Sequence, residues 1–498
     1  MMNTALFLAA VVLTSLNLGR ALPIRRQTPP QESNKFVVAH FMVGNTFPYK
    51  RNLARRRQTS FGKWHRCVCS QRWFRRLAKG QSDDAFNAAE ESGTGFKMFM
   101  SFDMSVNPCA GPADAAPLRE YITKYASHPA QFKFNGKVFA STFAGESCTF
   151  GAATPEQGWK QQFTDQLTGE NAAMFIQELA AMDGAFNWNG GWPTQISASK
   201  LSETISFLNS NPSNPSAAPI PVPASLTPIA NVVSPLAAPS LVSKRTHDKR
   251  AASDVASKLA AALAGSINLD SDRTIASNLG TSGASGAGNV YMSSVSPWFY
   301  THYGPDSFNK NWIFRSDDWL YNTRWDQLIQ GRNGIDIVQI ISWNDYGESH
   351  YIGPIEGAQP NSNAWVDGFD HQAWLEMTSY YATAFKTGQY PAITKDQVFL
   401  SARPHPAKAM PTEDNLWAVV FATQPGKLTL SADPSKPQSF DIPAGVSKLQ
   451  IPLIPGQGIT ATLTRNGATV VDMKPDFTFN PNPETYNYNA ATFIGSAE

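Results

Sequence analysis

The sequence contains little charge, which narrows the class of protein. Only 16% of the 498 residues are charged, below the usual quarter, whereas aromatic residues reach 11% and Trp occurs 13 times. This composition is typical of exported proteins that act on neutral polymers such as sugars, although a large aromatic core would produce it too.

The basic residues are unevenly spread along the chain. Residues 49–80 contain eleven Lys or Arg and no acid, with no clean helical or strand period. A nucleic-acid patch or a solvated basic loop would explain this block. Because the composition changes abruptly at both edges, we favour a misassigned coding frame and expect no nucleic-acid partner.

Long apolar runs are also absent. No run is long enough to cross a bilayer, so we expect no membrane-spanning segment and no membrane partner. Residues 1–21 have the features of a signal peptide, with a short apolar run at 5–13 and a small-residue cleavage site at 19–21. We therefore expect a secreted monomer, located outside the cell or in the cell wall.

Cysteine is scarce, with four residues in the chain. Four cysteines fit an oxidising compartment and allow three pairings, among which sequence alone does not choose. Cys109 and Cys148 lie in well-patterned sequence, so we prefer a disulfide between them. Cys67 and Cys69 lie in the basic block.

Several catalytic signatures are missing. The chain has no G-x-S-x-G, no H-E-x-x-H, no P-loop and no G-x-G-x-x-G before a helix. A Ser-His-Asp triad is therefore not indicated. Metal ligands do not cluster in the sequence, so we predict no cofactor and no metal.

The pattern that is present predicts an α/β fold. Apolar strand-like runs alternate with helical segments such as 116–127, 155–167 and 317–331, which indicates a parallel sheet. We predict a (β/α)8 barrel over residues 35–395, with its site at the strand C-termini. The expected strands are 35–43, 97–103, 137–143, 172–177, 184–188, 289–295 and 335–342.

Two segments do not show this alternation of strands and helices. Residues 203–288 are rich in Pro, Ser, Ala and Gly, and we expect a flexible insertion in the barrel or retained non-coding sequence. Residues 396–498 contain short alternating apolar runs separated by turn residues, which is typical of an all-β sandwich.

The densest group of polar and aromatic residues follows the strand expected at 335–342. It reads Trp343-Asn344-Asp345-Tyr346-Gly347-Glu348-Ser349-His350. On a helical turn, Asp345 and Glu348 would have Cβ atoms about 5–6 Å apart, close enough for one carboxyl to stay protonated while the other is ionised. Trp343 and Tyr346 could stack on sugars. A polar loop with unrelated surface acids is the alternative.

Further candidates lie elsewhere in the chain, most of them near other predicted strand ends. Trp188 and Trp192, in an Asn- and Gly-rich segment, are either a sugar subsite or a structural anchor. Trp298 and His302 show the same aromatic-polar mix, although an isolated His is more often structural. Asp318 is either a ligand or a helix N-cap. Asp103 and Glu146 are additional candidate acids.

These residues together resemble glycoside hydrolase family 71, the fungal α-1,3-glucanases or mutanases. The segments that carry the resemblance are 39–46, 96–103, 186–193, 296–299 and 343–371, together with the C-terminal region. The resemblance implies a barrel with an associated sandwich and hydrolysis of α-1,3-glucan with inversion by Asp345 and Glu348. We expect endo-acting cleavage.

The resemblance also implies particular roles and one defect. It makes Asp345 and Glu348 the acid–base pair, with a preference for Glu348 as acid, and it implies a substrate groove lined by Asp103, Trp188, Trp298, His302, Asp318 and Trp343. Residues 49–80 should supply the second barrel strand, which is not recognisable, so we expect an imperfect barrel there. A catalytically impaired α-glucan-binding wall protein and a barrel glycosidase for another neutral glucan are the rival hypotheses.

Overall fold

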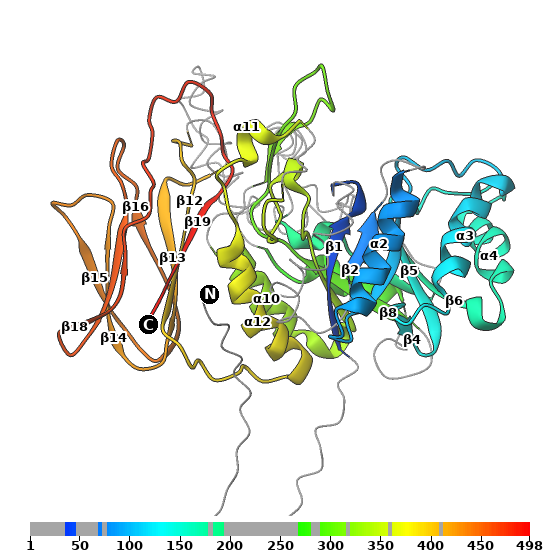
Figure 1. Cartoon of the computed structure of the whole chain (residues 1–498), viewed down its shortest axis with the longest axis horizontal. Coiled ribbons are helices and arrows are strands. Elements are labelled where there is room, and N and C mark those ends of the chain that lie inside the picture. Colours follow the sequence, from blue (N-terminus) through cyan, green and yellow to red (C-terminus); the bar gives the residue numbers. More distant parts are fainter. Residues whose placement is uncertain are drawn as a thin grey trace, which may run out of the picture. The chain divides into compact units, whose positions relative to one another are not determined.

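The computed structural model describes residues 35–45, 68–71, 77–177, 183–193, 267–279, 289–314, 319–356, 361–407 and 412–498 (Figure 1). The expected signal peptide, most of the basic block and most of residues 203–288 lie outside the described residues. Within the described ranges, no helix is both long enough and apolar enough to cross a membrane.

Eight parallel strands close into a ring, the arrangement of a TIM-like barrel. Each strand pairs with the next, and the last pairs with the first. In order around the ring, the strands are β1 (Phe36–Met42), β2 (Val68–Gln71), β3 (Met98–Asp103), β5 (Lys137–Phe143), β6 (Ala173–Gln177), β7 (Gly184–Phe186), β8 (Val290–Val295) and β11 (Ile337–Ile340). A short β4 (Lys133–Phe134) pairs antiparallel with β5 outside the ring.

The ring is stabilised by burial of both strand faces. All six residues of β3 and all six of β8 are buried, as expected for parallel strands covered by helices. The helices bury one face each; in α12, buried positions such as Trp374, Met377 and Tyr381 recur at spacings of three and four. The described α-helices of the barrel are α2 (Leu77–Glu91), α3 (Ala116–Tyr125), α4 (Pro155–Gln162), α9 (Asp270–Asn278), α10 (Leu320–Gln330), α11 (Asn363–Val366) and α12 (Gln372–Thr387).

The expectation of an imperfect barrel at residues 49–80 is wrong as far as strand pairing is concerned. β2 lies within this range and pairs with both β1 and β3. Its four residues form no long apolar run, so its own sequence does not identify it. The neighbouring strands explain why a strand forms here. Without β2, backbone N–H and C=O groups on the facing edges of β1 and β3 would lack hydrogen-bond partners.

The range 203–288, expected to be a flexible insertion, contains a helix that packs on the barrel. Asp272 of α9 is 3% exposed, and Arg324 of α10 is fully buried. Oδ2 of Asp272 lies 2.8 Å from Nη1 of Arg324. The same carboxylate accepts hydrogen bonds from the hydroxyls of Tyr291 and Ser293 in β8. The expectation therefore does not hold for α9, because this buried polar network secures it; 203–266 and 280–288 lie outside the described residues.

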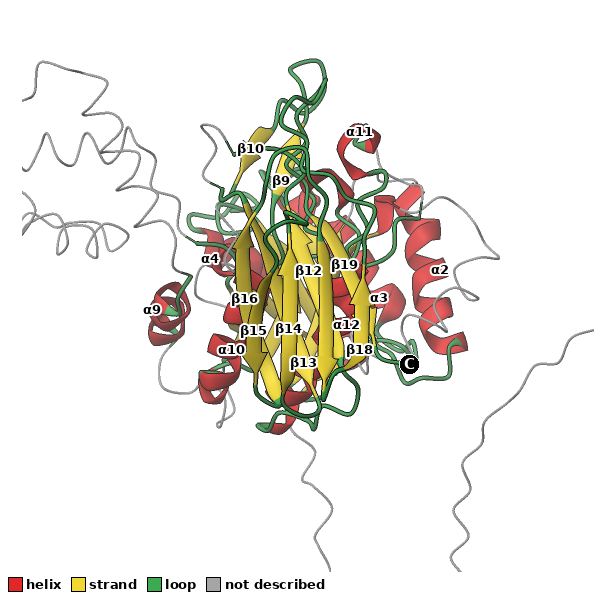
Figure 2. Cartoon of the chain, turned by 90° about the vertical axis from the view of Figure 1, so that its left-hand side faces the viewer, coloured by secondary structure: helices red, strands yellow, loops and turns green. Residues whose placement is uncertain are grey.

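The C-terminal strands form two four-stranded antiparallel sheets with a shared core (Figure 2). Leu400 and Val420 from one sheet belong to the same buried cluster as Leu428 and Leu463 from the other, as in a β-sandwich. The first sheet has the order β16 (Gly445–Pro452), β13 (Asn415–Ala422), β12 (Gln397–Ala402) and β19 (Ala491–Ser496), and the second β15 (Gln438–Ile442), β14 (Gly426–Ser431), β17 (Thr460–Arg465) and β18 (Ala468–Met473).

Strand β13 joins the cores of the barrel and the sandwich. Its residues Leu416, Ala418 and Val420 belong to the sandwich core, whereas Trp417 and Val419 belong to the barrel core. Because successive side chains of a strand point to opposite faces, one strand can serve both cores. This explains why residues 416–421 form a continuous apolar run instead of alternating with polar residues.

Candidate active site

The loop after β11 is attached to the end of β1, and this attachment positions Asp345 and Glu348. The side chain of Asn344 accepts a hydrogen bond from the Met42 amide at 2.7 Å and donates one to the Met42 carbonyl at 3.0 Å. The Asp345 amide donates to the Ser342 hydroxyl at 2.8 Å. Glu348 then ends the 3-10 helix η8 (Tyr346–Glu348). Both acids therefore lie at the C-terminal side of the barrel strands, where such barrels carry their sites.

His350 lies between the two carboxyl groups. Its Nε2 is 3.1 Å from Oε2 of Glu348 and 3.6 Å from Oδ2 of Asp345, and the imidazole is fully buried. A ligand atom from each of these three side chains lies within 4.8 Å of the other two. The structure thus brings the two predicted acids together with His350, a residue of the motif for which the sequence indicated no role.

Lys310 is a member of this cluster that sequence reasoning missed. It lies between β9 (Tyr300–His302) and β10 (Asn311–Ile313), and its Nζ is 3.1 Å from Oε1 of Glu348. No local pattern in the polar segment around Lys310 indicated a site. Only the antiparallel pairing of β9 with β10 carries this ammonium to the loop after β11.

The surroundings shift the two carboxyl groups in opposite directions. Burial, followed by the charge of Glu348, raises the pKa of Asp345 to about 6. Burial also acts to raise the pKa of Glu348, but the hydrogen bond and charge of His350 and the nearby Lys310 outweigh it and lower this pKa to about 2. Near pH 5 the pair therefore holds one protonated and one ionised carboxyl, the arrangement that general acid–base chemistry requires.

Asp103 lies close enough to this cluster to interact with its charges. It ends β3, is 6% exposed, and accepts hydrogen bonds from the amide and hydroxyl of Ser105. Burial raises the pKa of Asp103; the charge of Lys310 opposes this increase and that of Glu348 adds to it. Asp103 is thus a buried third acid beside this partly buried pair, within reach of its charges.

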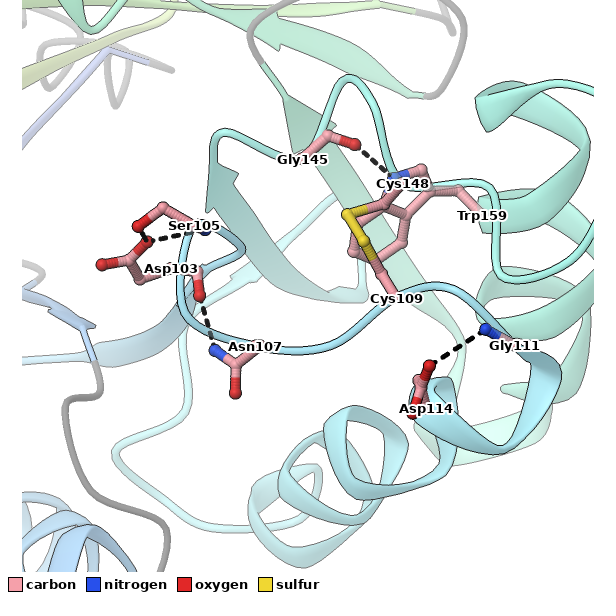
Figure 3. Close-up of a disulfide and its surroundings, with 9 residues drawn as sticks. All are labelled: Asp103, Ser105, Asn107, Cys109, Gly111, Asp114, Gly145, Cys148 and Trp159. Atoms are coloured by element: carbon pink, nitrogen blue, oxygen red, sulfur yellow. Dashed lines mark hydrogen bonds between the residues drawn. A yellow bond between two sulfur atoms is a disulfide. The ribbon is translucent and has the colours of Figure 1, made fainter.

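A disulfide supports the loop that follows Asp103 (Figure 3). Cys109 and Cys148 are bonded, with Cα atoms 5.2 Å apart, which ties the loop after β3 to the loop after β5. Asn107 donates to the Asp103 carbonyl at 2.6 Å, and the indole of Trp159 donates to the Gly145 carbonyl at 2.8 Å. The structure therefore contains the preferred pairing, in a position where it restrains the backbone of Asp103.

The predicted aromatic residues separate into two groups. Trp192 lies beside the cluster, with its ring centroid 5.5 Å from that of His350, and Trp188 contacts His40 at 4.9 Å. Trp343 packs closely over Gly353, where a Cβ would lie 2.7 Å from the indole. All three indoles are at most 8% exposed, so their faces are largely covered by protein.

The remaining predicted residues make packing or hydrogen-bond contacts with groups other than the two acids. Trp298 is 3% exposed and lies under the guanidinium of Arg403, 4.8 Å from the ring centroid, at the junction with the sandwich. The Tyr346 hydroxyl donates to the Pro354 carbonyl at 2.8 Å, and its ring is 1% exposed. His302 is exposed, with Nδ1 2.9 Å from Oδ1 of Asn311. Asp318 lies outside the described residues.

Within the described part of the chain, Asp345, Glu348 and His350 are the one group of three ligands close enough to share a metal ion. The ammonium of Lys310 already contacts Glu348 and contributes positive charge there. The expectation that the protein needs no metal or cofactor stays a prediction.

The sequence matches Glycosyl hydrolase family 71 over residues 33–222 and 262–498. The chain belongs to this family. Membership confirms the resemblance drawn from the motifs, and family 71 proteins are glycoside hydrolases, so this chain is one.

Two curated relatives align over nearly the whole family 71 chain. The glucan endo-1,3-alpha-glucosidase of Schizosaccharomyces pombe is 28% identical over 525 residues, which cover 99% of each chain. A mutanase of Penicillium rubens is 26% identical and covers 99% of this chain and 96% of its own.

Among solved structures, an endo-alpha-mannosidase of family GH99 from Bacteroides thetaiotaomicron covers 70% of this chain and 82% of its own, at 13% identity and a TM-score of 0.37. A glycoside hydrolase-like protein covers 74% and 98%, at 11% identity and a TM-score of 0.39. These TM-scores are too low to indicate a shared fold or substrate. The barrel of this family 71 protein is established by its own strand pairings.

Proposed function

We propose that this protein is a secreted enzyme that hydrolyses α-1,3-glucan by endo-acting cleavage, using Asp345 and Glu348. The observation that carries the proposal is the pair of adjacent carboxyl groups with opposite pKa shifts at the C-terminal side of the barrel. The substrate is proposed from the names of the two curated relatives.

In the proposed reaction, Asp345 is the acid and Glu348 is the base. Protonated Asp345 donates its proton to the glycosidic oxygen while ionised Glu348 accepts a proton from the attacking water. This assignment reverses the preference for Glu348 as acid. The reason is electrostatic: His350 and Lys310 both contact Glu348 and favour its ionised form.

We further propose that the reaction proceeds with inversion and that the carboxyl groups separate when substrate binds. Inverting pairs stand roughly 6.5–9.5 Å apart to leave room for a water, whereas here ligand atoms of the two acids lie within 4.8 Å. Movement of Glu348 away from His350 would open this space. The anomer formed first, read by NMR at early times, tests this step: β-glucose ends support inversion, and α-glucose ends would instead fit a nucleophilic carboxylate.

The hydrolase proposal is tested with single variants on insoluble α-1,3-glucan. Asp345→Asn and Glu348→Gln should each lower kcat by about 10²–10⁴-fold while glucan binding persists. Asp441→Asn, which changes an 86%-exposed carboxylate in the sandwich, is the matched control and should retain full activity. Equal reducing-sugar release by all variants would move the chemistry to other acids, with Asp103 and Glu146 next in line.

Azide separates the two roles. Azide attacks without a general base, so it should restore activity to Glu348→Ala and yield β-glucosyl azide, and it should not restore Asp345→Ala. Rescue of Asp345→Ala alone would reverse the assignment.

The rival hypotheses have different support. The hypothesis of a catalytically impaired binding protein depended on the strand that is not recognisable at residues 49–80. Strand β2 lies there and completes the ring, so this reason for the hypothesis no longer holds. A glycosidase for another neutral glucan is distinguished by linkage analysis of its products.

A further inference from the structure

The hairpin that supplies Lys310 also carries an unusual tryptophan. Trp312 of β10 is 39% exposed, and it is the one Trp among the large exposed apolar side chains of the described residues. The indoles at 188, 192, 298 and 343, which the sequence suggested as sugar contacts, are at most 8% exposed. A ring that stacks on a sugar needs an accessible face, so Trp312 meets a requirement that these buried indoles do not.

One face of β10 points toward the acid pair. Alternate residues of a strand share a face, which groups Lys310 with Trp312 and Phe314. Lys310 reaches Glu348, and the Phe314 ring stacks on Trp192 with centroids 5.3 Å apart. The other face is accounted for separately, because Asn311 pairs with His302 and Ile313 belongs to a buried cluster with Tyr346.

A continuous series of ring contacts joins Trp312 to the histidine of the site. The Trp312 ring stacks on Phe299, with centroids 5.6 Å apart and planes inclined by 17°. Phe299 in turn lies 5.7 Å from His350 at an inclination of 25°, and it is 2% exposed. Phe299 therefore orients the indole on one side while 39% of the Trp312 residue surface stays in contact with solvent.

We propose that Trp312 is the platform of a glucosyl subsite beside the acid pair, where its exposed face stacks on the apolar C–H face of a pyranose. The proposal rests on the proposed function and adds to it a binding residue for a neutral polysaccharide. Aromatic rings in carbohydrate and other ligand sites contribute apolar contact area without charge, which suits an uncharged chain. The ordinary alternative is that Trp312 only shields Phe299.

The test measures binding and turnover on α-1,3-gluco-oligosaccharides of increasing length. Trp312→Ala should raise KM and Kd about tenfold, equivalent to about 1.4 kcal/mol, with kcat within about twofold of the parent for oligosaccharides long enough to reach the subsite. Trp312→Phe, which keeps a smaller ring, should lie between the two. Tyr390→Ala is the matched control, because Tyr390 is a 44%-exposed aromatic residue whose hydroxyl bonds Asp326 in the helix α10 instead of the acid pair.

Two further readouts keep the proposal separate from folding and from the hydrolase proposal. The thermal midpoint of Trp312→Ala should stay close to that of the parent, whereas a purely shielding role predicts a lower midpoint with unchanged Kd. If the parent does not cleave α-1,3-glucan, the proposed function fails, and the Trp312 proposal is still decided by Kd measured from tryptophan fluorescence. Equal affinity of parent and Trp312→Ala at every length would overturn it.

Discussion

Lys310 and Glu348 are separated by 38 positions in the sequence, yet Nζ of the first lies 3.1 Å from Oε1 of the second. This contact places a positive charge from the β9–β10 hairpin on the loop that follows β11. The charge of this ammonium acts to lower the pKa of both acids. For Asp345 it opposes the larger effect of burial, and for Glu348 it adds to the effect of His350. The hairpin therefore helps to set the pH range in which the proposed pair has one proton.

Replacing Lys310 with Met should move the pH profile of kcat/KM to higher pH. The proposed active form needs ionised Glu348 and protonated Asp345. The acidic limb of the parent's profile therefore follows the pKa of Glu348, about 2, and the basic limb that of Asp345, about 6. Because the ammonium lowers both pKa values, its removal raises both, and each limb shifts upward. Lys310→Arg keeps the charge and should leave the profile nearly unchanged. A downward shift of the basic limb in Lys310→Met would contradict this account.

Asp345→Asn should stabilise the fold above pH 7 although it removes activity. The pKa of Asp345 is raised on folding, so the stability it contributes is present at low pH and is lost as pH rises through about 6. Asn cannot ionise and avoids this loss, a gain on the order of 1 kcal/mol. The thermal midpoint of the variant should exceed that of the parent by about 1 °C at pH 7.5 and by much less at pH 4. Equal midpoint differences at both pH values would show that Asp345 ionisation does not govern the effect.

The disulfide should be a major contributor to stability. Cys109 and Cys148 are 39 residues apart, and a loop of this length corresponds to about 4 kcal/mol in the chain-entropy description. The double Ser variant should unfold at lower urea concentration and should lose activity, because the loop behind Asp103 is released. Reductant should destabilise the parent to a similar extent and leave the double variant unchanged. An unaltered urea midpoint in the variant would show that the pair is dispensable.

Arg324→Met should destabilise the protein by about 3–5 kcal/mol, because it leaves the buried carboxylate of Asp272 without its cation. Arg273→Met is the matched control on the same helix as Asp272. Its partner is Asp270, and both side chains are more than 60% exposed, so the loss should be below about 1 kcal/mol. Urea unfolding of the two variants compares them directly, and similar losses would argue against a role of the buried pair in securing α9.

Much of the fold follows from local sequence. The apolar runs that became β1, β3, β5 and β11 are identifiable because a strand buried on both faces needs apolar residues at successive positions. The C-terminal strands are identifiable because turn residues separate short apolar segments. The loop from Trp343 to His350 also stands out locally, because it collects acids and aromatic residues directly after a buried strand.

Other features have no local signal. Strand β2 is defined by the edges of β1 and β3, and helix α9 by a buried ion pair with α10, so neither was predicted from its own composition.

The sequence by itself determined which residue types stand at the end of β11, namely two carboxyl groups and a histidine within six positions. Only the tertiary structure decided how they differ, because a pKa depends on burial and on charges that arrive from elsewhere in the chain. Lys310 reaches Glu348 through the pairing of β9 with β10, and the same hairpin leaves Trp312 exposed while the other candidate indoles are packed into the core. Exposure and charge proximity are properties of the assembled fold, and no single segment encodes them.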